Sequence, residues 1–174
     1  MQSFPSMSMV ESFTYEKDRS LDSDVMNAHQ KASLGTANLI KYVEDYYRMN
    51  DDFDSIVGLS QIMQAEAIRF AVEAHRRNMP YCMGTLYWQF NDCWPVISWS
   101  SIDYGGNWKA LHYAARKFFS PILVSIRDLD DKIEIHVIND QHHEVESRIR
   151  LGLFNLNGDI PVSYTHLTLP TKQP

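Results

Sequence analysis

Apolar side chains recur at helical spacing over residues 59–77, and this pattern predicts the longest helix of the chain. Its apolar stripe is formed by Leu59, Ile62, Met63, Ala67, Phe70, Ala71 and Ala74. Two shorter helices are predicted upstream. The first has Asp22 or Ser23 as its N-cap and Gly35 as its stop, and the second begins with Thr36 as its cap.

A short apolar run, residues 83–90, follows the long helix and predicts a strand covered on both faces, as in a parallel sheet. Because side chains alternate along a strand, Trp88 and Phe90 share one of these faces. A long loop then leads to a helix over residues 107–119, with Asn107 as its N-cap. A parallel strand, a long loop and a helix form the arrangement in which (β/α)8 barrel enzymes place their active-site residues.

In the C-terminal part of the chain the spacing changes to alternation, which predicts antiparallel strands. Strands are expected over residues 122–126, 132–139 and 144–154, followed by a hairpin turn at Asn157-Gly158. These segments have the pattern of the opening strands of a β-sandwich. A complete sandwich of this kind has about seven strands, so only part of one is predicted.

All four tryptophans, Trp88, Trp94, Trp99 and Trp108, lie in the predicted strand and the loop after it, interleaved with Asn, Asp and Ser side chains. A tryptophan is a large apolar plate with a single N–H donor. Such rings beside polar side chains suit a sugar, which has an apolar C–H face and a rim of hydroxyl groups. A packed aromatic corner is the alternative, and composition alone favours it.

Composition narrows the class of protein. With 44% hydrophobic and 22% charged residues, the 174-residue chain can build a core and is not of the disordered type. The net charge of −6 and the lack of a basic stripe argue against nucleic acid, and no apolar run is long enough to predict a membrane span. Cys82 and Cys93 are predicted to be buried free thiols, and no spacing of Cys, His or acidic residues indicates a metal site. We therefore expect no metal and no organic cofactor.

The segments GTLYWQFNDCWP and SWSSIDYGGNWKALHY closely resemble β-mannosidases of glycoside hydrolase family 2, and so do MQSFPS at the start and MNAHQK. The resemblance covers roughly residues 1–160. It implies that residues 1–120 are the C-terminal portion of the glycosidase (β/α)8 barrel and that residues 121–161 are an incomplete immunoglobulin-like β domain. Residues 162–174 depart from the family pattern and are predicted to be a non-native tail.

The resemblance also implies a substrate-binding site. Trp88, at the end of the predicted strand, would form the hydrophobic floor of the subsite for the scissile sugar, and Asn91, Asp92 and Trp94 would begin the loop above it. A second role is equally expected for Asp92, namely to cap or brace the loop backbone instead of contacting the sugar. Residues 2–4 would follow the seventh barrel strand and approach the same site.

In the family, the nucleophilic glutamate lies in a Ser-Glu-aromatic-Gly segment directly before Met-Gln-Ser-Phe-Pro, and the acid/base glutamate lies on an earlier strand. Both would precede Met1, so no catalytic residue is expected in this chain. The chain is expected to be an inactive fragment of a retaining exo-acting β-mannosidase, which hydrolyses terminal β-D-mannosyl residues of oligosaccharides or glycoconjugates. Its expected partners are this β-mannoside substrate and the missing N-terminal part of the same enzyme.

Two alternatives stay open at this stage. Another family 2 glycosidase, a β-galactosidase or a β-glucuronidase, fits the same residues, because sugar choice depends on residues outside this chain. A non-catalytic carbohydrate-binding module would carry its aromatic residues on the sandwich portion, and the lack of tryptophan after Trp108 argues against it. The compartment is left open because the true N-terminus is expected to be missing.

Overall fold

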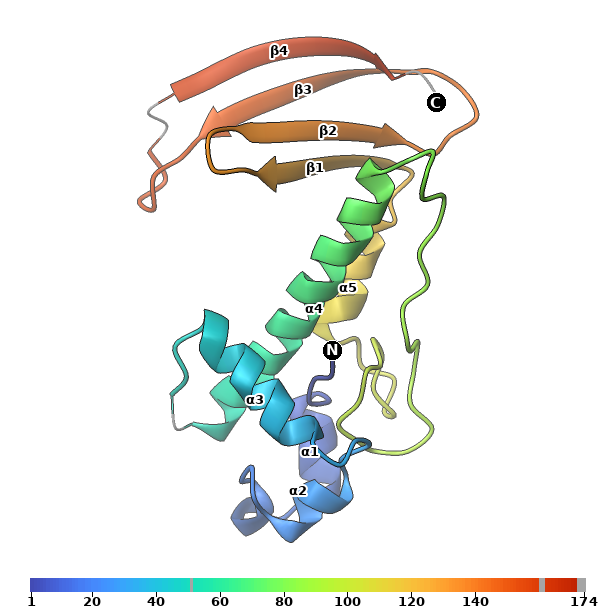
Figure 1. Cartoon of the computed structure of the whole chain (residues 1–174). Coiled ribbons are helices and arrows are strands. Elements are labelled where there is room, and N and C mark those ends of the chain that lie inside the picture. The colour runs from blue at the N-terminus through green and yellow to red at the C-terminus, as the bar shows by residue number, and fades with distance from the viewer. Residues whose placement is uncertain (51, 160–161, 172–174) are drawn as a thin grey trace. The chain divides into compact units, whose positions relative to one another are not determined.

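The structure, a computed structural model, describes residues 1–50, 52–159 and 162–171. These residues form two compact units of a mixed α and β protein. Residues 1–76 and 82–119 make up the first unit, and residues 77–81 together with the chain from residue 120 onward make up the second. The described helices lie before residue 120 and the described strands after it (Figure 1).

The first unit is built from helices and irregular segments. Its elements are α1 (Met7–Phe13), a single 3₁₀ turn η1 (Glu16–Asp18), α2 (Asp24–Ala28), α3 (Gly35–Tyr46), α4 (Phe53–Arg77) and α5 (Ala110–Phe118). Helix α4 confirms the longest predicted helix and begins six residues earlier than expected. The earlier start is explained by Asp52, whose carboxylate accepts from the backbone N–H of Ser55 at 3.0 Å and from its hydroxyl at 2.6 Å.

The boundary between α2 and α3 differs from the prediction. Ser23 caps α2, as one of the two predicted candidates, by accepting from the backbone N–H of Met26 at 3.1 Å. The helix nevertheless ends at Ala28, and Gly35 begins α3 instead of ending α2. The prediction of Thr36 as the cap of α3 is also wrong, because the N-cap position is taken by Leu34 without a side-chain bond.

The cap of α5 was predicted wrongly as well. Lys109 occupies the N-cap position, and Asn107 lies two residues outside it. The backbone N–H of Asn107 donates to the carboxylate of Asp103 at 2.9 Å, and its side-chain amide donates to the same group at 3.1 Å. Asn107 is therefore committed to the turn before the helix.

The apolar run over residues 83–90 does not form the predicted strand. A strand needs a hydrogen-bonded neighbour, and no described residue pairs with residues 83–88 as a strand. The side chains of this segment still alternate between two sides, but other residues cover only one of these sides. Thr85, Tyr87 and Gln89 are half-buried, whereas Leu86, Trp88 and Phe90 are exposed. The prediction of cover on both faces is thus wrong for this chain.

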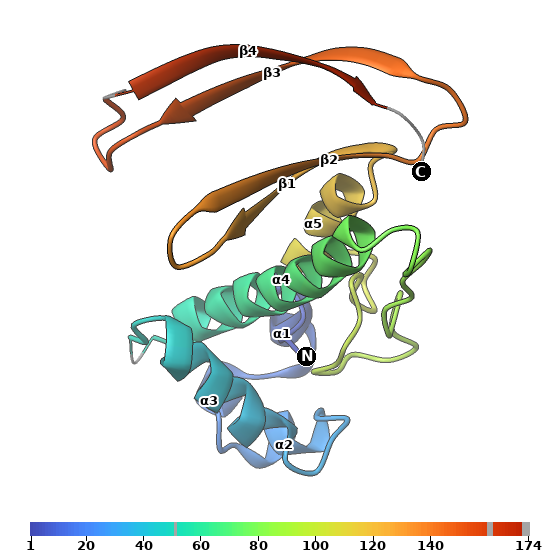
Figure 2. The same ribbon diagram turned by 45° about the horizontal axis from the view of Figure 1, so that its top comes forward.

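Two apolar clusters form the core of the first unit. The larger one joins the N-terminal segment, α1, α2, α3, the first half of α4 and the loop at Ile97; its buried members are Phe4, Val10, Met26, Leu39, Val43, Ile56, Val57, Met63 and Ile97. The smaller one joins α4 to α5 through Ala65, Val72, Leu111, Ala115 and Phe118. Figure 2 shows α5 alongside the C-terminal half of α4, which the second cluster explains. In both clusters the apolar side of a helix packs against apolar side chains of other elements.

The second unit contains two antiparallel strand pairs. Strand β1 (Ile122–Asp128) pairs with β2 (Ile133–Asn139), and β3 (Val145–Leu153) pairs with β4 (Val162–Thr171). The three strands predicted from alternation are confirmed. The predicted turn at Asn157-Gly158 is also confirmed, with Gly158 at a positive φ of 89°.

The segment predicted to be a non-native tail contributes β4, whose backbone pairs with that of β3. The origin of this tail stays a prediction. Within the described ranges, none of the helices combines the length and the apolar content needed to cross a bilayer.

Candidate substrate-binding site

Gln89, the residue after Trp88, is held through both its backbone and its side chain. Its backbone N–H donates to the carbonyl of Trp99 at 3.2 Å, and its carbonyl accepts from the backbone N–H of Ser101 at 3.1 Å. Its side-chain amide donates to the carboxylate of Asp92 at 3.0 Å. These contacts anchor the chain immediately after Trp88, at the point where the unpaired run over residues 83–88 ends.

The indole of Trp88 is presented to the outside of the first unit. It is 72% exposed and lies on the uncovered side of its segment. The opposite side is fixed by Tyr87, which stacks on Phe119 and donates its hydroxyl to Ser101 at 3.0 Å. For Trp88, the alternative of a packed aromatic corner does not describe this chain.

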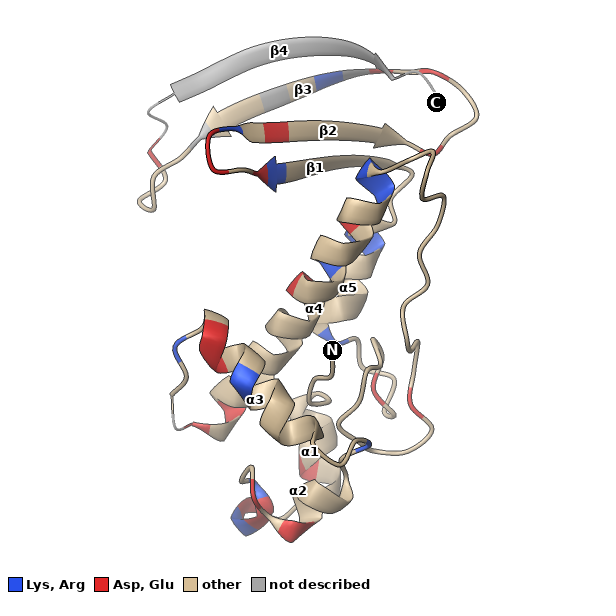
Figure 3. Cartoon of the chain, in the orientation of Figure 1, with Lys and Arg blue, Asp and Glu red and all other residues tan. Residues whose placement is uncertain are grey.

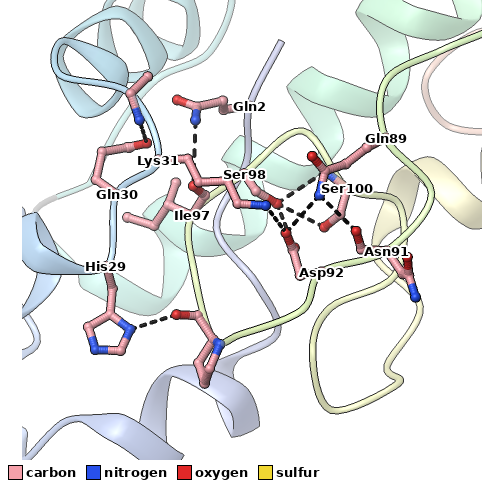
Figure 4. A network of polar contacts seen from close by, with 12 residues as sticks. Gln2, His29, Gln30, Lys31, Gln89, Asn91, Asp92, Ile97, Ser98 and Ser100 are labelled. Carbon is pink, nitrogen blue, oxygen red and sulfur yellow. Dashed lines mark hydrogen bonds and ion pairs between the residues drawn. The ribbon is translucent and has the colours of Figure 1, made fainter.

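Asp92 carries a buried carboxylate whose two oxygens both accept from protein groups. One oxygen accepts from the ammonium of Lys31 at 2.8 Å, and the other accepts from the hydroxyl of Ser98 at 2.6 Å (Figure 4). The Asp92 side chain is 1% exposed, and that of Lys31 is 19% exposed. These contacts are those of a brace that holds the loop, which was one of the two predicted roles of Asp92.

The other two predicted site residues of the loop are open to solvent. Asn91 is exposed, and its backbone carbonyl accepts from the side chain of Gln89 at 2.7 Å. Trp94 is 36% exposed and lies with its ring centroid 5.5 Å from that of His29. The structure thus brings Trp88, Asn91 and Trp94 onto one braced segment with their side chains accessible.

Residues 2–4 do not face an open site. Gln2, Ser3 and Phe4 are all buried, and Phe4 belongs to the larger core cluster. The backbone of Ser3 pairs with that of Ser98 through N–H to carbonyl bonds of 2.9 Å and 3.2 Å. Their side chains therefore support the loop from within the protein, and the prediction that they approach the sugar site directly is not what this structure shows.

Lys109 is a functional candidate that the sequence reasoning missed. Its side chain is fully buried, and its ammonium donates to the carbonyls of Ser3 at 3.3 Å and Ser98 at 3.4 Å and to the hydroxyl of Ser100 at 3.4 Å. Burial lowers the pKa of Lys109 to about 7, although the negative charges of Asp92 and Asp103 act in the opposite direction. A lysine at a helix N-terminus is electrostatically unfavourable, and this was the signal that could have drawn attention to it.

Neither a charged patch nor a metal-binding group of side chains accompanies the site among the described residues (Figure 3). Figure 3 shows acidic and basic residues interspersed along the helices of the first unit. Within the described part of the chain, no group of three His, Cys, Asp or Glu residues is arranged to hold a metal ion. Cys82 and Cys93 are both free thiols, but Cys82 is only half-buried and Cys93 is exposed, so the prediction of buried thiols is wrong for both.

Comparisons with known proteins agree on one class. No family model matches the chain. A β-D-mannosidase from Dictyoglomus thermophilum superposes with a TM-score of 0.83 at 30% identity, over 98% of this chain and 22% of that protein. An exo-chitosanase from Amycolatopsis orientalis has the same fold, with a TM-score of 0.81 at 21% identity over 97% of this chain and 21% of its own. The fold is thus that of a segment of a glycoside hydrolase.

Sequence relatives are more specific. The β-mannosidase of Capra hircus is 33% identical over 165 residues, which are 86% of this chain and 19% of the goat protein. The β-mannosidase B of Aspergillus terreus is 37% identical over 131 residues, 73% of this chain and 16% of its own. Over the region that it spans, the chain belongs to the β-mannosidases of glycoside hydrolase family 2. It spans about one fifth of the length of the curated relatives that it matches.

Proposed function

We propose that this chain supplies part of the sugar-binding site of a retaining exo-acting β-mannosidase, which hydrolyses terminal β-D-mannosyl residues of oligosaccharides or glycoconjugates. The observation that carries the proposal is the exposed Trp88 on a braced segment, in a chain whose relatives are β-mannosidases. The nucleophile and the acid/base glutamate would come from polypeptide upstream of Met1. No metal or organic cofactor takes part in this proposal.

The fold supports this reading. We infer that α4, residues 83–90 and α5 are the last helix, strand and helix of a (β/α)8 barrel, and that the second unit is the start of an immunoglobulin-like domain. In such a barrel the helices cover the outer side of each strand, while the inner side and both edges are covered by other strands. The segment over residues 83–90 has one covered side and one bare side, and its residues 83–88 lack strand partners among the described residues. The missing cover is what the rest of a barrel would supply.

Within that arrangement, Trp88 would lie at the inner, carboxyl end of its strand, where barrel active sites are built. An indole there offers a flat apolar surface to the C–H face of a pyranose ring. It also excludes water, which strengthens the electrostatic interactions of the reacting groups. Asn91 and Trp94, which are exposed on the same loop, would border the sugar. We assign Asp92 to the brace, because protein donors already occupy both of its carboxylate oxygens.

The decisive experiment is Trp88→Ala in the complete enzyme, in which the upstream polypeptide precedes this chain. We expect kcat/KM for an aryl β-mannoside to fall at least about tenfold. Tyr46→Ala is the matched control, because Tyr46 is an aromatic residue that is also 72% exposed but lies on α3. A fall of less than about threefold with Trp88→Ala would remove this residue from the site.

Two further measurements test the class of enzyme. The purified 174-residue chain should show no hydrolysis of an aryl β-mannoside, because neither carboxylate of the proposed pair lies in it, and measurable turnover would overturn the division of the site. The complete enzyme should prefer the β-mannoside over the β-galactoside and the β-glucuronide. A preference for either of the latter would select the alternative family 2 activity.

A further inference from the structure

We propose that residues 29–31 form a clamp that positions the sugar-contacting loop, with Lys31 acting on Trp88 through Asp92 and His29 acting on Trp94. This inference rests on the proposed function, because it concerns how the same site is held. The residues of the clamp do not touch the sugar. They are positioning residues, and the name "clamp" refers below to His29, Gln30 and Lys31.

The backbone of the clamp is joined to the loop at a buried residue. The carbonyl of His29 accepts from the backbone N–H of Ile97 at 2.7 Å, and the backbone N–H of Lys31 donates to the carbonyl of Ile97 at 3.3 Å. These two bonds place Gln30 and Ile97 in a short parallel bridge. Ile97 is fully buried in the larger core cluster, so the clamp ties the loop to the rigid part of the unit (Figure 4).

Lys31 acts on Trp88 through a relay of charged and polar groups. Its ammonium lies 2.8 Å from the carboxylate of Asp92, which also accepts from the side chain of Gln89, the residue that follows Trp88. Removing Lys31 leaves the buried carboxylate of Asp92 without its cation, and only the neutral donors Gln89 and Ser98 remain on it. Removing Lys31 should therefore force Asp92 and its partners to rearrange rather than leave them in place.

His29 is held by a ring stack on Phe13 and reaches the segment of Trp94 through one hydrogen bond to Pro95. Its ring lies parallel to that of Phe13, with centroids 4.0 Å apart and planes 8° apart. Its Nδ1 donates to the carbonyl of Pro95 at 2.6 Å, and the indole of Trp94 lies with its centroid 5.5 Å from that of the imidazole, tilted by 38°. The backbone next to Trp94 is thus fixed by a residue 66 positions away in the sequence.

The orientation of Trp88 depends on its two neighbours, and the side chain of one of them, Gln89, is held by Asp92 and so by the clamp. Residues 83–88 have no strand partner among the described residues, and the indole is largely exposed. Neither Trp88 nor Trp94 is a buried member of the two core clusters. Loss of the clamp should therefore disturb the orientation of these rings more than it disturbs the core.

The test uses Lys31→Met in the complete enzyme, with Lys41→Met as the matched control at an exposed lysine of α3. At a temperature where circular dichroism shows both variants fully folded, Lys31→Met should lower kcat/KM for an aryl β-mannoside at least about tenfold, and Lys41→Met less than twofold. Lys31→Arg, which keeps the charge, should recover most of the loss. In a double-mutant cycle, adding Asp92→Asn to Lys31→Met should cost less than about twofold more, because the two residues act as one unit.

Fluorine NMR tests the positions of the tryptophan rings directly, without an activity measurement. The 174-residue chain contains four tryptophans, so labelling with 5-fluorotryptophan gives four fluorine signals, and the signal of Trp88 is identified by Trp88→Phe. Lys31→Met should shift or broaden the Trp88 signal and leave that of Trp108 unchanged. His29→Phe, which keeps the ring stack but removes the bond to Pro95, should act on the Trp94 signal.

The outcomes separate this proposal from the proposed function. If Trp88→Ala abolishes activity while Lys31→Met matches Lys41→Met in both kcat/KM and the fluorine spectrum, the clamp is refuted and the site stands. If Trp88→Ala leaves activity intact, the site itself is refuted. If Lys31→Met lowers only the melting temperature, with no change in kcat/KM or in the Trp88 signal, Lys31 has a purely structural role and the clamp is wrong.

Discussion

Replacing Lys109 with Met removes a buried charge and should change how the stability of the chain depends on pH. The ammonium of Lys109 is fully buried and contacts only neutral oxygens, at 3.3–3.4 Å, among the described residues. Methionine has a similar length and no charge. The carbonyls of Ser3 and Ser98 each keep a backbone partner, because the two residues donate to one another, so the substitution leaves neither of them unsatisfied.

The size of the effect follows from the pKa of Lys109. Burial is the largest cause of its shift; the charges of Asp92 and Asp103 act to raise this pKa, that of Lys31 acts to lower it, and together these effects lower the pKa from 10.5 to about 7. Between about pH 7 and 10.5 the unfolded chain therefore holds a proton that the folded chain has lost. Raising the pH through this window favours the folded state, by about 1.4 kcal/mol per pH unit at most.

The assay is urea unfolding, followed by circular dichroism, of the wild-type chain and of Lys109→Met. The free energy of unfolding of the wild type relative to the variant should be nearly constant below about pH 6 and should rise by about 2.5 kcal/mol between about pH 7.5 and 9.5. Burial also lowers the pKa of the N-terminal amine, which gives a contribution of the same sign below its ordinary value of 8.0. That contribution is present in both proteins and cancels in the difference.

Lys41→Met is the control, because Lys41 is exposed, and its difference from the wild type should stay flat over the same window. A flat difference for Lys109→Met would mean that Lys109 keeps an ordinary pKa, and the description of an unpaired buried ammonium would be refuted. A difference that falls as the pH rises above about 10.5 would have the opposite sign and would show a cation stabilised by an ion pair.

Two further predictions concern the fold of the first unit. Phe4→Ala should lower the free energy of unfolding, measured in urea, by roughly 3–5 kcal/mol, because Phe4 is fully buried in the larger cluster. Phe70→Ala is the control at an exposed position and should lower it by less than about 1 kcal/mol. Equal losses for the two variants would contradict this core. Gly106→Ala should lower the melting temperature by an amount that corresponds to about 1–2 kcal/mol, because Gly106 has a φ of 84°. Gly84→Ala, where a new Cβ meets nothing within 4 Å and φ is not positive, is its control, and equal shifts would show that the turn conformation is not the cause.

Local periodicity alone determined much of this protein. Helix α4 and strands β1, β2 and β3 follow from the spacing of apolar residues, because that spacing reflects the geometry of neighbouring residues along the chain. The predicted alternation of side chains is also confirmed over residues 84–90, and it places Trp88 and Phe90 on one side. The concentration of tryptophan beside polar residues pointed to the loop that the structure braces.

Tertiary contacts decided the rest, and each of them joins residues far apart in the sequence. Helix α2 stops at Ala28 because the next residues bond to the backbone of Ile97. The carboxylate of Asp92 binds Lys31, 61 positions away in the sequence, and this contact supports its proposed role as a brace. Whether residues 83–90 form a strand depends on a neighbouring strand, which no local pattern supplies. The packing of the whole unit decides which distant residues become hydrogen-bond partners. Such partners do not recur at a regular spacing, so a pattern along a single sequence does not predict them.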